Sequence, residues 1–489
     1  MAAKDFIVAI ELGSSKMTGI AGKKNLDGSI SVLAVVKEES SSFIRKGVIY
    51  NIDKTAQCIA NIVKKLTAQL KTEITQVYVG VGGQSIRSVK NVNVKTLQPD
   101  TIVTQNMVNE LMDANRNMVY QDQEILDAAT QEYKVDSQYQ MDPVGIQCSR
   151  LEGNFLNILW RKMFYRNLNK CFDMANVSIA EMFLAPLALA DSVLTDAEKR
   201  SGCALVDLGA DTTTVSVYYK NILRHLAVIP LGSNNITKDI ASLQMEESQA
   251  EQMKLRYASA WTENGDIDNS LKLTIDSERS VDSRKFVEIV EGRVQEIIEN
   301  VWYQVPSDYT DRLLGGLIIT GGGSNMKNIE TAFRNHTRIE KIRIAKFVQQ
   351  SISSKDPLIT ARNGMMCTVL ALLAKGDMSC AGEEIDQNAD LFDPSRKQKG
   401  KNEPQREPRT PSELEPGVVQ TAAEKQKIEE ERKRLEEEEA ARQAEIAAEE
   451  ARKKAEEEER KRRENSGMKK FGKKMGAFFK KLITETDDE

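Results

Sequence analysis

The sequence predicts an α/β fold built of two related halves, followed by a charged linker and a short amphipathic helix. Strand-like, helix-like and glycine-turn segments alternate over residues 1–380. The stretches IVAIELGSSKMTGIAG at 7–22 and ALVDLGADTTTVSVYY at 204–219 repeat one plan of strand, tight turn and strand. After Gly382 large apolar residues become rare and charged residues take over. The globular part is therefore expected to end near this point.

The overall composition argues against several classes of function. A length of 489 residues allows about two to four domains. The formal net charge of −5 argues against a general nucleic-acid-binding protein, and the two histidines argue against zinc chemistry or a Ser-His-Asp mechanism. The six cysteines form no CxxC pair, so with no signal peptide we expect reduced thiols in the cytosol. No apolar run approaches the ~20 residues of a membrane-spanning helix, so we expect no span.

The two repeated hairpins have the chemistry of phosphate-binding turns. A glycine turn lets backbone N–H groups approach phosphate oxygens, hydroxyl groups add donors, and the preceding acid can hold a hydrated Mg²⁺. For either stretch taken alone, an ordinary polar hairpin is the alternative. The candidate residues are Glu11, Gly13, Ser14, Ser15 and Lys16 in the first hairpin, and Asp207, Gly209, Thr212 and Thr213 in the second.

A third glycine turn follows in GGLIITGGGSNMKNIETAF at 315–333. It indicates an apolar strand, three glycines and a helix beginning near Asn325. Consecutive glycines let a flat ligand such as a nucleoside lie against the backbone where a strand meets a helix. Two hairpins and this turn, in this order, favour a nucleotide clamp. The candidate residues of the turn are Gly321, Gly322, Gly323 and Met326.

This order of motifs resembles the actin-like ATPase superfamily, in which two phosphate hairpins and a glycine-rich adenosine turn surround ATP between two domains. Residues 5–376 and the terminal helix are similar to the FtsA family of bacterial cell-division proteins. Glu11, where most of the superfamily has aspartate, also fits FtsA. The stretches that carry the resemblance are KGVIYNID (46–53), QEYKVD (131–136), DPVGI (142–146), LRHLAVIPLGSNNITKDIA (223–241) and AEQMKLRY (250–257).

The resemblance implies an actin-like two-domain fold with an FtsA-type inserted small domain. The polar helix expected at 102–116 and the QEYKVD strand fit that inserted domain. The implied boundaries are 1–85 with 166–200 for subdomain 1A, 86–165 for the FtsA-type subdomain 1C, 201–234 with 311–380 for subdomain 2A, 235–310 for subdomain 2B, 383–466 for a charged disordered or helical linker, and 467–484 for an amphipathic membrane-binding helix.

The resemblance also implies ligands. Bound ATP and Mg²⁺ would lie at the hairpins, and Glu251 and Lys254 match positions that flank the nucleotide; a surface i,i+3 pair is the alternative. The second small domain would receive the C-terminal peptide of the tubulin-like protein FtsZ. Lys285 and Arg293 match basic residues that meet this acidic peptide, with a solvated helix face as the alternative.

The second hairpin departs from the superfamily pattern. The usual Asp-x-Gly-Gly-Gly-Thr is here Asp207-Leu208-Gly209-Ala210-Asp211-Thr212. Asp211 would repel a polyphosphate, since two unit charges ~4 Å apart at an effective dielectric near 20 interact by about 4 kcal/mol. Asp211 is therefore expected either to point away from the phosphates or to act through Mg²⁺. We expect ATP binding with at most slow hydrolysis.

The last segments of the chain are a charged stretch and a cationic helix. Residues 420–464 place acids and bases three or four apart, which supports a solvated helix, whereas a coiled-coil seam would have only Ile428, Leu435 and Ile446. In GMKKFGKKMGAFFKKLI at 467–483, apolar residues recur at helical spacing between six lysines. The apolar residues expected on the membrane face are Phe471, Met475, Phe478, Phe479, Leu482 and Ile483.

Such a helix can dimerise, bind a calmodulin-like groove, dock on its own chain or lie in a membrane interface. Six unopposed lysines would repel across a dimer seam, and the long linker does not suit an intramolecular dock. Anionic lipid headgroups attract each basic residue by about 1 kcal/mol. FtsA-like proteins end in such a helix, so a membrane tether is the prediction.

The sequence therefore predicts an ATP-binding cell-division protein that tethers FtsZ filaments to the membrane and itself assembles into filaments. It would be peripheral, on the cytoplasmic side of the cell inner membrane at the division septum, with anionic lipids and further divisome proteins as partners and no nucleic acid. A small-molecule kinase of the sugar or acetate type from the same superfamily is the alternative, but such an enzyme gains nothing from a tail helix. A chaperone ATPase would need a β-rich peptide-binding domain, which the residues after 380 do not suggest.

Overall fold

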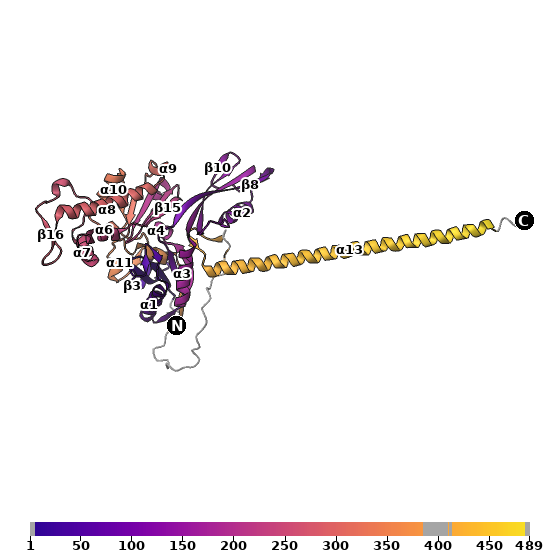
Figure 1. The fold of residues 1–489 in the computed structure, drawn as a ribbon, viewed down its shortest axis with the longest axis horizontal. Helices are drawn as coiled ribbons and strands as arrows, with labels where there is room; N and C mark the ends of the chain where they lie inside the picture. The colour runs from indigo at the N-terminus through magenta and orange to yellow at the C-terminus, as the bar shows by residue number, and fades with distance from the viewer. Residues whose placement is uncertain (1–4, 385–408, 410–412, 485–489) are drawn as a thin grey trace, which may run out of the picture. The chain divides into compact units, whose positions relative to one another are not determined.

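The computed structural model describes residues 5–384, 409 and 413–484. The chain divides into two units, Met1–Ala422 and Ala423–Glu489. The first unit, here called the body, contains both predicted halves (Figure 1).

The first half of the body is a seven-stranded sheet with the order β20-β3-β2-β1-β7-β12-β22. Strands β1, β7 and β12 run parallel, and β2 and β3 extend the sheet antiparallel on one side. Helices cover both faces, which is why β1 and β7 are runs of almost wholly buried apolar residues. The strands are β1 (Ile7–Leu12), β2 (Lys16–Lys24), β3 (Ile30–Glu39), β7 (Gln76–Val81), β12 (Ser178–Leu184), β20 (Ile352–Ser353) and β22 (Val418–Val419); the helices are α1 (Ile52–Leu70), α3 (Lys162–Ala175), α4 (Ala185–Val193) and α12 (Cys367–Lys375).

The second half repeats this topology. Its strands run in the order β15-β14-β13-β18-β19, with β13 parallel to β18 as β1 is to β7. The two hairpins close in the same register, Leu12 opposite Met17 and Leu208 opposite Thr213. The predicted duplicated α/β fold is confirmed. The strands are β13 (Cys203–Leu208), β14 (Thr213–Tyr219), β15 (Ile222–Ile229), β18 (Gly316–Thr320) and β19 (Ile342–Ile344); the helices are α5 (Asp196–Ser201), α6 (Ser233–Ala241), α7 (Glu247–Tyr257), α8 (Ser283–Gln304), α9 (Ser307–Thr310), α10 (Ile329–Thr337) and α11 (Pro357–Thr360).

An inserted domain extends the second sheet from its outer edge. Strand β8 meets β15 at Arg87 and Ala227, and the nine-stranded sheet runs β10-β9-β11-β8-β15-β14-β13-β18-β19. Helix α2 packs on β8, β9 and β11 over a small separate core that includes Leu111, Leu151 and Phe155. The helix predicted at 102–116 is present as α2, which the Thr104 side chain caps. The elements are β8 (Arg87–Ile102), α2 (Gln105–Arg116), β9 (Gln123–Val135), β10 (Gln138–Gln140) and β11 (Gln147–Arg161).

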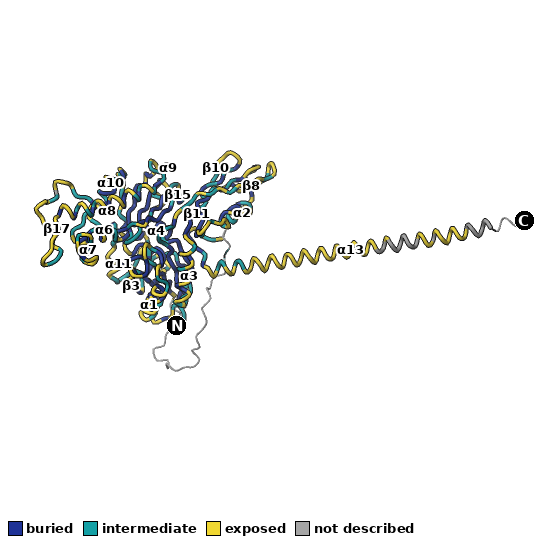
Figure 2. The backbone as a smooth tube through the Cα atoms, viewed as in Figure 1, coloured by how far each residue is buried: buried dark blue, intermediate teal, exposed yellow. Residues whose placement is uncertain are grey.

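Burial follows these layers, with buried residues in the strands and in the inner faces of the helices (Figure 2). Across the described residues, no helix combines the length and apolar character that crossing a bilayer requires. The remaining short elements of the body are β4 (Ile44–Arg45), β5 (Val48–Ile49), β6 (Thr72–Ile74), β16 (Lys272–Thr274), β17 (Ser280–Asp282), β21 (Ala381–Glu384), and the 3₁₀ turns η1 (Asn264–Asp266) and η2 (Gly322–Asn325).

Part of the predicted linker belongs to the body. The charged linker over residues 383–466 was expected to be disordered or helical, but this is wrong for Gly417 and Val418, which are buried, and Val418 opens strand β22 against β12. Two adjacent valines are too short a run to show periodicity in a charged stretch. Residues 385–408 lie outside the described part of the chain.

The second unit is the long helix α13 (Ala422–Thr484), whose first residue belongs to the body. Its charged part carries i,i+4 ion pairs such as Lys453 with Glu449 and Lys461 with Glu457, both at 2.8 Å. These pairs support a solvated helix. The helical backbone runs through the predicted membrane helix, where Met475 and Phe478 are exposed. The side chains of Phe471, Phe479, Leu482 and Ile483 lie outside the described part.

Candidate functional site

The first hairpin forms a tight turn that neighbouring segments hold by hydrogen bonds. The Ser40 hydroxyl donates to the Gly13 carbonyl at 2.6 Å, and the Gly47 N–H donates to the Ser14 hydroxyl oxygen at 2.7 Å. A Cβ on Gly13 would lie 2.6 Å from the Lys16 carbonyl oxygen, so the turn requires glycine. The neighbouring Ser15 is exposed and can reach a ligand.

The second hairpin has the same geometry. The Gly209 N–H donates to the Thr212 carbonyl at 2.9 Å, and a Cβ on Gly209 would lie 2.7 Å from that oxygen. The N-terminus of α6 lies against this turn, since Asn234 N–H donates to the Ala210 carbonyl at 2.7 Å. Thr213 was predicted to contact the cofactor, but it is fully buried and its hydroxyl donates to the Leu231 carbonyl at 2.8 Å. Its only side-chain donor is therefore used inside the fold.

The acids of the two hairpins, Glu11 and Asp207, form a half-buried carboxylate pair. Burial raises the pKa of Glu11 to about 7, against the opposing effect of Lys16 and with a further contribution from Asp207. Burial likewise raises the pKa of Asp207 to about 6, and burial lowers the pKa of Lys16. Among the described residues, Glu11 Oε2 is buried with no hydrogen-bond partner. A buried, unpaired carboxylate oxygen is costly unless a ligand satisfies it, so this pair suits a hydrated cation.

Asp211 joins the two halves of the body. Its Oδ2 accepts from the backbone N–H of Lys46 at 3.1 Å, and its Oδ1 accepts from Asn234 Nδ2 at 2.8 Å. Lys46 lies between β4 and β5 in the first half, whereas Asp211 and Asn234 belong to the second. Each carboxylate oxygen has a protein donor, which favours a structural role over metal ligation. Neither Lys46 nor Asn234 was singled out from the sequence as a site residue, because contacts between segments distant in the sequence leave no local signal.

The glycine-rich turn packs directly on the second hairpin. Gly321 has φ +85, and a Cβ there would lie 2.3 Å from Asp207 Oδ1 and 2.6 Å from the Leu208 carbonyl oxygen. The turn continues as η2, in which the Ser324 hydroxyl donates to the Gly321 carbonyl at 2.7 Å. The helix that was expected to begin near Asn325 begins instead at Ile329, because the glycines form a 3₁₀ turn first. Gly321 and Gly323 thus lie beside the Asp207 hairpin, and contact of Gly321, Gly322 and Gly323 with a nucleoside stays a prediction.

Glu251 and Lys254 form one network with the start of α6. Lys254 Nζ lies 2.7 Å from Glu251 Oε2 and 2.9 Å from the Thr237 hydroxyl, and it donates to the Ser233 carbonyl at 3.2 Å. Lys254 is buried and Glu251 is half-exposed. The pair therefore anchors the first turn of α6, which itself braces the second hairpin. Thr237 completes the network and was not predicted from the sequence.

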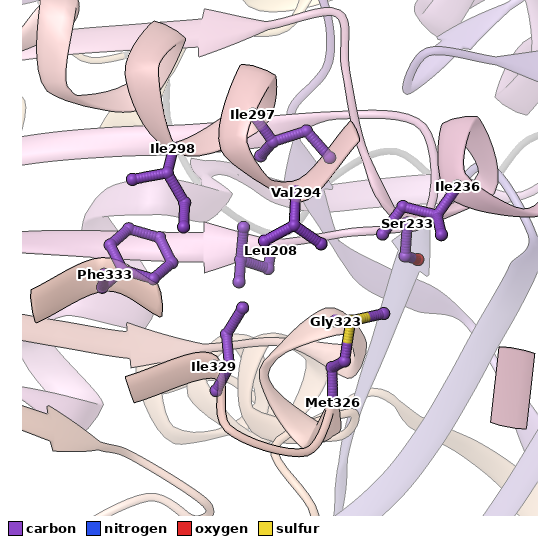
Figure 3. Close-up of a pocket in the computed structure, with 10 residues that line it drawn as sticks. All are labelled: Leu208, Ser233, Ile236, Val294, Ile297, Ile298, Gly323, Met326, Ile329 and Phe333. Atoms are coloured by element: carbon purple, nitrogen blue, oxygen red, sulfur yellow. The ribbon is translucent and has the colours of Figure 1, made fainter. Parts of the chain in front are cut away.

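An apolar cavity of about 20 Å³ lies under the turn (Figure 3). Leu208 at the end of β13 and Met326 after η2 face residues of α6, α8 and α10 across it. This volume holds about one water-sized molecule. The predicted Met326 therefore contributes to an apolar floor beside the glycine turn. The lining residues are Leu208, Ser233, Ile236, Val294, Ile297, Ile298, Gly323, Met326, Ile329 and Phe333.

Lys285 and Arg293 both lie on α8, but their environments differ. Lys285 is exposed, whereas Arg293 donates from Nη2 to Asp239 Oδ1 at 3.1 Å and also pairs with Glu296. The charge of Arg293 is thus already opposed by two carboxylates. An acidic ligand at this face would have to compete with both.

Known proteins resemble this chain in sequence and in fold. The family described as "Cell division protein FtsA" matches residues 204–371, and "SHS2 domain inserted in FTSA" matches residues 83–159. The chain is 31% identical over 333 residues to the cell division protein FtsA of Porphyromonas gingivalis, covering 66% of this chain and 69% of the relative. It is also 31% identical to that of Neisseria meningitidis over 331 residues, covering 66% and 80%. The FtsA of Bacillus subtilis is 27% identical over 346 residues, covering 68% and 78%.

A solved structure shares the fold at low identity. The PilM-PilN type IV pilus biogenesis complex aligns with a TM-score of 0.52 at 12% identity, covering 75% of this chain and 97% of that chain. The two hairpins of equal register, the inserted domain on the outer edge of the second sheet and the sequence matches agree with one another. The chain has the actin-like fold and belongs to the FtsA family of cell division proteins.

Proposed function

We propose that this cell-division protein binds ATP between its two halves. The observation that carries the proposal is the pair of hairpins in identical register, each presenting a glycine turn and a half-buried acid, with the Gly321 turn packed against the second. The exposed Ser15 and the half-buried Thr212 are placed to donate to phosphate oxygens. The apolar floor at Met326 suits the nucleoside end.

The two half-buried acids fit a magnesium ion that accompanies the nucleotide. Glu11 and Asp207 are oxygen ligands of the kind that Mg²⁺ prefers through its water shell, and Glu11 Oε2 is buried without a partner among the described residues. A bound Mg²⁺ would neutralise phosphate charge. Glu11 and Asp207 would hold and orient its water molecules, while Lys16, half-buried beside Glu11, balances the local charge.

We predict ATP binding with turnover slower than about one per second, the lower end of ordinary enzyme rates. Asp211 is held by Lys46 and Asn234 rather than free to assist the reaction. Replacing it by glycine should weaken ATP affinity by several-fold, because one bridge between the halves is lost. The measurements are ATP affinity by calorimetry and phosphate release for wild type and Asp211→Gly.

Asn234→Ala serves as the matched control for this prediction. It removes one of the two donors to Asp211 and should lower affinity less than Asp211→Gly. Brisk ATP turnover by the wild type, or no ATP binding at all, would contradict the proposal.

Features of the tail and of α8 support a role for this protein in tethering FtsZ filaments to the membrane. The helix α13 ends in the lysine-rich amphipathic stretch, with Met475 and Phe478 exposed. Such a surface suits insertion among anionic headgroups. We propose that the protein is peripheral, on the cytoplasmic side of the cell inner membrane at the septum, that it assembles into filaments, and that it holds FtsZ filaments there with other divisome proteins.

The FtsZ peptide site is proposed on α8, with Lys285 as its main cation. Lys285 is exposed, whereas Arg293 would contribute only after leaving Asp239 and Glu296. An acidic peptide gains both affinity and encounter rate from such cations.

We predict that Lys285→Glu combined with Arg293→Glu weakens binding of the FtsZ C-terminal peptide at least tenfold, because two charges are reversed against an acidic ligand. Peptide binding is measured by fluorescence anisotropy at fixed salt. Arg284→Glu is the matched control, since Arg284 is an exposed cation on the same helix but turned by about 100° from Lys285. Equal affinity of the double variant and the wild type would place the site elsewhere.

A further inference from the structure

A short apolar stretch of the linker adds a strand to the sheet of the first half. Val418 and Val419 pair antiparallel with Phe183 and Met182 of β12. The Leu184 N–H donates to the Gly417 carbonyl at 2.7 Å. Val418 is 2% exposed and Val419 1% exposed, so the stretch covers an edge that β12 would otherwise present.

The same stretch reaches the inserted domain. The Gly417 N–H donates to Asp127 Oδ2 at 2.7 Å, and Asp127, on β9, is fully buried. The other oxygen of Asp127 accepts from Arg116 Nη2 on α2 at 2.8 Å. A buried carboxylate needs donors on both oxygens, and one of these donors comes from the linker. Gly417 has φ +85, so this position favours glycine.

Helix α3 holds the far end of the stretch. The Tyr165 hydroxyl donates to the Gln420 carbonyl at 2.8 Å, and Asn169 Oδ1 accepts from the Ala422 N–H at 2.9 Å. Tyr165 and Asn169 are both buried and lie one turn apart on α3. Upstream, Arg409 pairs with the buried carboxylate of Glu181 on β12. Strands β9 and β12 and helix α3, all far from this segment in the sequence, thus each form hydrogen bonds with it.

We propose that residues 413–421, called the strap from here on, are an intramolecular latch. The strap ties the sheet of the first half to the inserted domain and sets the residue at which the tail leaves the body. The segment that covers the edge of β12 belongs to the same chain, because that chain supplies the glycine, the two valines and their register on β12. Movement of the inserted domain relative to β12 would break the bonds of the strap. Conversely, release of the strap would make that movement easier by the same free energy, because the coupling is reciprocal. The latch depends on neither ATP nor membrane binding.

Hydrogen exchange on the full-length protein tests the latch. In Val418→Asp combined with Val419→Asp, two charges would have to be buried, so the strap should detach. We expect the amides of Leu184 and Ala128 to exchange at least tenfold faster, because Leu184 donates to the strap and Ala128 donates to Asp127. Amides of β13 should keep their rates. Glu415→Ala with Pro416→Ala is the matched control, since both residues are exposed in the same turn, and should leave all these rates unchanged.

Gly417→Pro is a second test of the latch, to be used if the double aspartate variant does not fold. It removes the N–H that Gly417 donates to Asp127 Oδ2 and excludes the observed φ. The same amides should exchange faster while circular dichroism stays that of the wild type. Unchanged exchange in both strap variants would overturn the latch.

Cleavage of the chain upstream of the strap tests whether the strap alone holds the tail on the body. A protease site inserted between Arg396 and Lys397 of the full-length protein is cleaved after folding. We expect the tail fragment to co-elute with the body at the mass of one chain, and to elute separately in Val418→Asp combined with Val419→Asp. Separation of the cut wild-type fragments would overturn the proposal, and so would co-elution at the mass of two chains, which would mean that the strap is exchanged between copies.

Discussion

Phe478→Glu combined with Phe479→Glu should weaken binding to anionic vesicles by at least about a hundredfold. Phe478 is 64% exposed on α13, so its ring is available to the acyl boundary rather than to the protein. Burying an aromatic side chain is worth about 1.5–3 kcal/mol, and each tenfold change in affinity corresponds to about 1.4 kcal/mol. The measurement is flotation with vesicles that contain an anionic lipid. Deletion of residues 467–489 should have the same effect and leave ATP binding intact.

The same helix provides the control for this prediction. Leu435→Glu with Ile446→Glu makes the same kind of change at two positions that are each 53% exposed in the charged part of α13. These variants should float as the wild type does, because the charged part has no apolar face to insert. Wild-type binding should also fall with added salt, since the lysine contribution is screened. Undiminished flotation of the double phenylalanine variant would refute the tether.

Gly321→Ala should abolish ATP binding and lower the melting temperature by about 5 °C or more. The new Cβ would lie 2.3 Å from Asp207 Oδ1 and 2.6 Å from the Leu208 carbonyl oxygen, and φ +85 is itself unfavourable for alanine. Both displaced atoms belong to the second hairpin, so the strain falls on the proposed phosphate turn. Scanning calorimetry at one heating rate, with and without ATP, measures both effects. ATP should raise the melting temperature of the wild type and not that of Gly321→Ala.

Gly322→Ala is the adjacent control. Its Cβ would find its nearest atom, Met365 Cγ, at 3.5 Å, which is ordinary contact, and its φ is not in the left-handed region. Its melting temperature should stay within about 1 °C of the wild type. A wild-type melting temperature and ATP response in Gly321→Ala would show that the turn does not pack on Asp207 in solution.

Local patterns predicted much of this molecule. The two hairpins, the glycine turn and the helix α2 were expected at their positions, because turns and periodic faces depend on residues close together in the chain. The alternation of charges likewise predicted the solvated helix of the tail. The acids of the hairpins could be named from the sequence, since each immediately precedes its glycine turn.

Contacts between distant segments were decided only by the tertiary structure. Nothing near Asp211 in the sequence indicates that Lys46 would donate to it, and nothing near Thr213 indicates that Leu231 would take its hydroxyl hydrogen. Val418 and Val419 look like two isolated apolar residues in a charged linker until β12 and Asp127 are beside them. Burial and hydrogen bonding depend on which surfaces meet. A local stretch of sequence shows the periodicity of each surface, but it does not show which surface will pack against it.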